Sequence, residues 1–172
     1  MKQLYPEISI SAYKGIFLLL MLLIGSGVAQ QRKSIDRSDL SKGIEIIINN
    51  QQLSGTGKVL AVQDTGGHQL VLTHAYLNGE KLWLRNSATL MSSGNRGIHW
   101  YYDKTTGVLS LAIEPFLKRL SAGDQLRLLI SPLQFTEGQL SLTVYQTSTY
   151  PATIPTNSSP VSQVNIEIKG AK

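Results

Sequence analysis

The chain has 172 residues, a formal net charge of +5, and 42% hydrophobic against 16% charged residues, which is the composition of a folded globular protein. Its basic residues are scattered singly and form no basic run or helix face, so nucleic-acid binding is not expected. Because the sequence contains no cysteine, it excludes disulfides, thiol catalysis, cysteine-ligated metals and a lipid-bearing cysteine, and the fold depends on its core alone.

Residues 1–29 have the organisation of a secretory signal. The apolar run GIFLLLMLLI follows Lys2 and Lys14 and precedes the small residues Gly27 and Ala29. We predict cleavage after Ala29 and export to the periplasm or out of the cell, as a secreted protein. The alternative is an uncleaved anchor, but the apolar run is shorter than the roughly 20 residues that cross a bilayer. No membrane insertion of the mature chain is expected.

A polar lead-in at 30–43 precedes a chain in which apolar residues recur with a period of two. In the first such stretch Ile44, Ile46 and Ile48 fall on one face. About nine short stretches of this kind are separated by turn residues. They are 43–50, 58–64, 68–77, 80–86, 97–103, 107–113, 125–131, 139–146 and 161–169. The pattern predicts an all-β protein, an antiparallel β-sandwich.

Two segments depart from the alternation. Pro115 stands at a helix-start position and Gly123 at a stop, which predicts one short helix between strands. The segment 147–160 is rich in Thr, Ser and Pro and is unsuited to a central strand. It therefore connects a sandwich domain at 44–146 to a last strand at 161–172. That strand either belongs to the same domain as an edge strand or is donated to a partner by β-augmentation.

The sequence contains no complete motif for catalysis or metal binding. SGTGK at 54–58 resembles the end of a phosphate-binding loop, but Gln52 and Val59 occupy the positions that require glycine and Ser or Thr. His68 and His74 would lie roughly 20 Å apart along a strand, too far to share one metal ion. We expect no enzyme activity, no metal and no cofactor.

Asn78-Gly79 predicts a two-residue hairpin turn, which would pair His74 with Trp83 on the flanking strands. The pairing divides the side chains into a small apolar face and a face of aromatic and charged groups. The apolar set, predicted to face the core, is Val71, Thr73, Ala75, Leu77, Leu82 and Leu84, and the outward set is Leu72, His74, Tyr76, Lys81, Trp83 and Arg85.

The stretch IHWYYD at 98–103 is interpreted in the same way. Because Ile98 is apolar, its face is predicted to point inward together with Trp100 and Tyr102. His99 and Tyr101 then point outward, and Tyr101 joins the candidate binding residues.

Two aromatic rings, a histidine and two cations on one outward face are typical of a sugar-stacking platform or of a protein-interface hot spot. The candidate binding residues are His74, Tyr76, Lys81, Trp83, Arg85 and Tyr101. The leading hypothesis is a non-catalytic exported β-sandwich, a structural or protein-interaction subunit of the cell envelope. The alternative is a carbohydrate-binding module that takes a surface glycan around Trp83. A small hydrolase with an unrecognised site is the third hypothesis.

Overall fold

The computed structural model describes residues 30–36, 42–49, 52–53, 59–90, 97–113, 123–134, 137–154 and 156–169. The strands are β1 (Gln30–Asp36), β2 (Ile44–Asn49), β3 (Val59–Asp64), β4 (Leu70–Leu77), β5 (Glu80–Lys81), β6 (Trp83–Asn86), β7 (Gly97–Asp103), β8 (Val108–Ala112), β9 (Gln125–Pro132), β10 (Gly138–Thr147) and β11 (Ser162–Lys169). No α-helix occurs among these described residues. The predicted signal at 1–29 and the predicted helix at 115–122 lie outside them.

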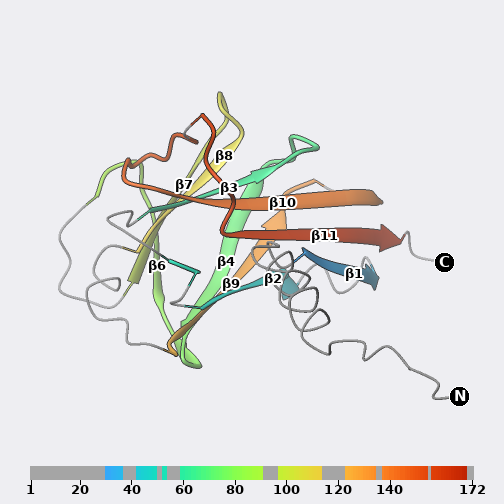
Figure 1. Cartoon of the computed structure of the whole chain (residues 1–172), viewed down its shortest axis with the longest axis horizontal. Helices are drawn as coiled ribbons and strands as arrows, with labels where there is room; N and C mark the ends of the chain where they lie inside the picture. Colours follow the sequence, from blue (N-terminus) through green and yellow to red (C-terminus); the bar gives the residue numbers. More distant parts are fainter. Residues whose placement is uncertain are drawn as a thin grey trace, which may run out of the picture.

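The strands form two sheets (Figure 1). The larger sheet has seven strands in the order β1-β11-β10-β3-β8-β7-β6, and the smaller has four in the order β2-β9-β4-β5. Neighbouring strands are antiparallel except for the two end pairs of the larger sheet, β1 with β11 and β6 with β7. In Figure 1, β10 and β11 run across the view in front of β4 and β9. The prediction of an all-β protein rich in antiparallel strands is confirmed.

Side chains from both sheets form one buried cluster. The smaller sheet contributes the alternating residues Ile44, Ile46 and Ile48 of β2, and the larger sheet contributes the alternating apolar residues of β10 and β11. Each fully buried residue of this size contributes roughly 1.5–3 kcal/mol relative to an exposed one. The alternation of apolar residues in the sequence therefore reports the core-facing side of these strands, as predicted.

The two ends of the described chain meet in the larger sheet. The segment predicted as a polar lead-in contains β1, which lies parallel to β11. Strand β11 also pairs with β10 and buries Val164, Ile166 and Ile168 in the core cluster. The last strand therefore lies inside the sheet and is not at its edge.

The Thr-, Ser- and Pro-rich connection covers part of the outer face of the larger sheet. Ala152 packs with Val59, Ala61 and Ala112 in a second buried cluster. Its backbone N–H donates a hydrogen bond to the buried Oγ of Ser110 at 2.7 Å. Figure 1 shows the connection from β10 to β11 passing beside β7 and β8. The connection thus covers the centre of the outer face of this sheet. Strands β7 and β6 lie at the end of the sheet, beyond that centre.

Strand β4 contains a bulge that the sequence pattern did not predict. Its register against β9 shifts between Leu72 and His74, and the hydroxyl of the extra residue, Thr73, donates to the Leu129 carbonyl at 3.0 Å. One extra residue reverses the alternation of faces. Leu72, predicted to point outward, is buried, and Val71, predicted to face the core, is partly exposed.

The hairpin turn is present, but the predicted pairing extends only to Leu82, whose N–H donates to the Ala75 carbonyl at 2.8 Å. Asn78 and Gly79 both have positive φ, 51° and 85°, as the expected two-residue turn requires. Strand β5 pairs with β4 in the predicted register. Leu82 then enters the core cluster, and from Trp83 onward the chain pairs with β7 in the larger sheet. The predicted pair of His74 with Trp83 is therefore wrong, because the chain changes sheets at the buried Leu82.

Candidate functional site

The change of sheet at Leu82 separates the predicted binding residues into two groups. His74, Tyr76 and Lys81 belong to the smaller sheet, and Trp83, Arg85 and Tyr101 belong to the larger one. The prediction of one continuous outward face on the hairpin is therefore wrong.

The group on the smaller sheet is a packed set of surface side chains. The rings of His74 and Tyr76 are stacked, with centroids 6.3 Å apart and an interplanar angle of 15°. The guanidinium carbon of Arg127 lies 4.8 Å from the centroid of the Tyr76 ring, and Arg127 Nε lies 2.8 Å from Glu45 Oε1. Because solvent screens this half-exposed ion pair, its contribution to stability is small. The face of the Tyr76 ring is therefore already in contact with the guanidinium of Arg127.

The group on the larger sheet is organised around Trp83, which lies against Gly97. The two residues are register partners in the parallel pair of β6 and β7. A Cβ added to Gly97 would fall 2.7 Å from Trp83 Cε3 and 2.8 Å from the Trp83 carbonyl oxygen. Because Gly97 has no side chain, the indole of Trp83 packs directly against the backbone of β7. Trp83 nevertheless keeps 47% of its surface exposed, so the ring is held in place and remains accessible.

His99 lies next to Trp83 and was not among the predicted binding residues. Its parity on β7 puts it on the outer side of the sheet, as expected, yet the residue is buried. The Trp83 and His99 rings meet edge to face, with centroids 6.2 Å apart and an interplanar angle of 77°. Burial, and secondarily the charge of Arg85, lowers the pKa of His99 from its ordinary value. Burial thus favours the neutral form of the imidazole, and its buried Nδ1 has no hydrogen-bond partner.

Arg85 and Tyr101 extend this group along the two strands. Arg85 is the register partner of His99, and both Arg85 and Tyr101 are partly exposed. Tyr101 lies close to Tyr150, whose pKa is raised by burial and, to a smaller extent, by Tyr101. The Tyr150 hydroxyl donates to the Ser87 carbonyl, just beyond the end of β6. We call Trp83, Arg85, Gly97, His99 and Tyr101 the Trp83 surface.

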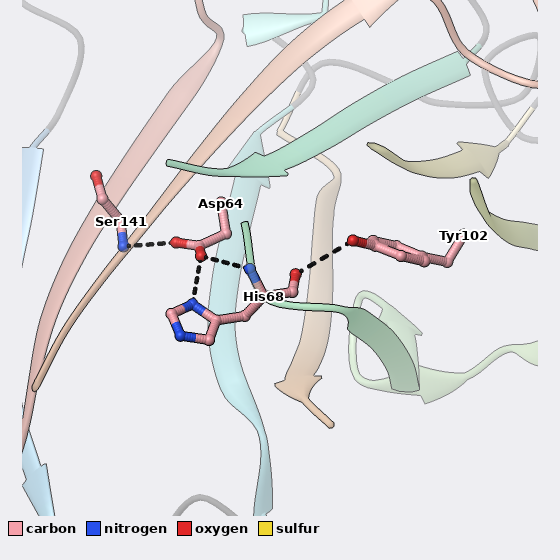
Figure 2. Close-up of polar contacts among 4 residues, drawn as sticks. All are labelled: Asp64, His68, Tyr102 and Ser141. Carbon is pink, nitrogen blue, oxygen red and sulfur yellow. Dashed lines mark hydrogen bonds and ion pairs between the residues drawn. The ribbon is translucent and has the colours of Figure 1, made fainter. Parts of the chain in front are cut away.

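A second polar cluster lies around the buried carboxylate of Asp64 (Figure 2). Its Oδ2 accepts hydrogen bonds from His68 Nδ1 at 2.6 Å and from the His68 backbone N–H at 3.1 Å, and its Oδ1 accepts from the Ser141 N–H at 3.1 Å. The Tyr102 hydroxyl donates to the His68 carbonyl at 3.4 Å. The carboxylate therefore fixes the turn between β3 and β4 and ties it to β10.

This cluster contains Asp, His and Ser, but its geometry is not that of a nucleophilic triad. Ser141 reaches Asp64 through its backbone, and its Oγ lies 2.5 Å from Asn165 Oδ1. Figure 2 shows the hydroxyl directed away from His68. A triad needs the hydroxyl bonded to the imidazole. The arrangement is that of a structural turn, and Gly66 leaves room for it, because a Cβ there would lie 2.8 Å from His68 Cε1.

The described part of the chain offers few other sites. Over those residues, no three His, Cys, Asp or Glu side chains come close enough to hold a metal ion. None of the described segments forms a helix with the length and apolar character needed to span a membrane.

Comparison with known proteins gives no relative. No protein-family model matches the sequence. No curated protein matches it either. Among solved structures, a cysteine protease inhibitor, EhICP2, from Entamoeba histolytica aligns over 83% of this chain and 100% of its own, with 7% identity and a TM-score of 0.27. A likeness of that size indicates neither a common fold nor a common function.

Proposed function

We propose that this protein is an exported, non-catalytic β-sandwich of the cell envelope that acts by binding, and that it binds through the Trp83 surface. The observation that carries the proposal is the half-exposed indole of Trp83 held against Gly97 and the edge of His99. An aromatic side chain fixed before binding presents a large apolar area at little cost in conformational entropy. The buried cluster shared by both sheets supports the sandwich architecture.

The ligand belongs to one of two classes, a surface glycan or an envelope protein. Stable protein interfaces bury about 1,200 Å² or more around an apolar centre. Trp83 stands among polar neighbours, since Lys81 and Asn86 are exposed and Arg85 is partly exposed. An exposed ring with polar and charged neighbours suits a sugar, which stacks through its C–H face and forms hydrogen bonds at its rim. These features favour a glycan over the protein partner that the sequence pattern placed first.

A protein partner remains the second candidate, and Leu90 favours it. This residue follows β6 and keeps 46% of its surface exposed, so a second large apolar side chain stands on the described surface after the Trp83 strand. An exposed apolar side chain of this size adds to the apolar area that the centre of a protein interface buries.

The experiment that tests the proposal is crosslinking in the native envelope with matched aromatic variants. Trp83→Ala should lose the crosslinked species, whether glycan or protein, while Tyr76→Ala on the smaller sheet should keep it. Far-UV circular dichroism of both purified variants checks that they are folded. Loss of the crosslink in Tyr76→Ala and its retention in folded Trp83→Ala would overturn the proposal.

A further inference from the structure

The positive charge of Arg85 has no counter-ion within the described structure. Glu45 pairs with Arg127, and the buried carboxylate of Asp64 is bonded to His68. Arg85 instead has the buried imidazole of His99 as its strand neighbour. Arg85 is partly exposed, so its guanidinium is available to an anionic group from solvent that reaches this end of the sheet.

The neighbouring nitrogen also lacks a partner. Nδ1 of His99 is buried and forms no hydrogen bond, although the great majority of buried polar atoms in folded proteins form at least one. Arg85 and His99 are register partners on adjacent strands, so a cation without a carboxylate partner and a ring nitrogen without a hydrogen bond stand side by side in the described structure. They adjoin the exposed indole of Trp83, which meets the His99 ring edge to face.

We propose that the Trp83 surface binds an acidic sugar, with the sugar ring stacked on Trp83 and its carboxylate accepting hydrogen bonds from the Arg85 guanidinium and from His99 in the tautomer that carries its proton on Nδ1. This inference rests on the proposed function and names its ligand class. The planar guanidinium of arginine matches a carboxylate through two parallel hydrogen bonds. Because Nδ1 of His99 is buried and the Trp83 ring lies against the His99 ring, we expect the indole to move when the carboxylate reaches Nδ1. Tryptophan fluorescence therefore reports the binding.

The charge of the whole chain agrees with an anionic ligand. The formal net charge is +5 and the sequence pI is about 9.5. Positive charge spread over a protein raises the local concentration of anions and speeds their association. The polar surroundings of Trp83 favour an acidic sugar over an acidic segment of a protein, which would need an apolar interface centre as well.

The test uses oligomers of galacturonate and, as a matched neutral ligand, the same oligomers with their carboxyl groups methyl-esterified. Titration of the purified protein, followed by tryptophan fluorescence and calorimetry, should show binding to the acid form. Esterification should weaken that binding about tenfold or more, since charge-assisted hydrogen bonds of this kind are lost. Arg85→Gln should weaken it to a similar extent. Lys169→Gln, which removes an exposed cation from β11 across the sheet, should leave it unchanged.

Three results would overturn the inference. They are equal affinity for the acid and esterified oligomers, undiminished binding by Arg85→Gln, and binding of a poly-glutamate peptide without binding of galacturonate or alginate oligomers. If Trp83→Ala still loses envelope crosslinking while no acidic oligosaccharide binds, the proposed function stands and the acidic-sugar ligand is wrong. If the acidic oligomers bind equally well to Trp83→Ala, both fail.

Discussion

The substitution Gly97→Ala addresses the contact on which the Trp83 surface depends. The added methyl would meet Trp83 Cε3 at 2.7 Å and the Trp83 carbonyl oxygen at 2.8 Å. Optimal contact between non-bonded carbon atoms is about 3.5–4.0 Å. The indole and the backbone of the short end strand β6 must therefore both move.

The expected cost has two parts. Overpacking of this kind costs about 1–3 kcal/mol. Removing the ring with Trp83→Ala relieves the clash with Cε3 and leaves the clash with the carbonyl oxygen, so Gly97→Ala should cost less in that background. We expect a coupling free energy of about 0.5–1.5 kcal/mol between the two substitutions, in the range measured for residues in contact.

Urea unfolding of the four proteins in this cycle, followed by far-UV circular dichroism, measures the coupling. Circular dichroism is preferred because the chain has only two tryptophans and one of them is removed. Gly97→Ala should also weaken ligand binding, since it displaces the indole. If Gly97→Ala costs the same with and without the Trp83 ring, the indole does not depend on this glycine and the reasoning is refuted.

Four further substitutions test the core, the Asp64 turn and the buried His99. Leu128→Ala, at a fully buried core position, should lower the free energy of unfolding by about 2–5 kcal/mol, whereas Leu133→Ala, at an exposed position, should change it by less than about 0.5 kcal/mol; equal effects would contradict the assigned core. Asp64→Asn replaces a buried charged acceptor and should cost about 1.5–3 kcal/mol by urea unfolding, and an unchanged midpoint would show that the turn does not need the carboxylate. Burial and then Arg85 lower the pKa of His99 in the folded state, so protonation favours unfolding and stability should fall as the pH drops below about 6.5. His99→Gln should flatten that part of the stability profile, and an unchanged slope would argue against a buried neutral imidazole.

The strands and the core could be predicted from the sequence because burial on one side imposes a local period of two. Val164, Ile166 and Ile168 in β11 alternate with polar residues, and Ile44, Ile46 and Ile48 in β2 share one face although Ile47 lies between two of them; the burial of both sets follows from the period of two. No information from distant parts of the chain was needed for these faces.

The errors arose where distant segments decide the outcome. The bulge at Thr73 depends on the Leu129 carbonyl of β9, and one inserted residue reversed the predicted faces of Val71 and Leu72. The departure of the chain at Leu82 depends on the availability of β7 as a parallel partner. Neither partner is visible in the local pattern.

Only part of the candidate site could be predicted, because its membership also depends on which distant strands pair. Trp83, Arg85 and Tyr101 remain together on the larger sheet, but His74 and Tyr76 belong to the other sheet. Gly97 and His99 were missed as members of the site. Their roles follow from the parallel pairing of β6 with β7, and the outward parity of His99 was the only signal in the sequence.

The central claim is that ligand binding depends on Trp83 and not on the aromatic pair of the smaller sheet. The most direct measurement is the fraction of protein crosslinked in the native envelope for wild type, Trp83→Ala and Tyr76→Ala, each verified as folded. We expect the crosslinked fraction to fall to background in Trp83→Ala and to stay at the wild-type level in Tyr76→Ala. A wild-type fraction in folded Trp83→Ala would contradict it.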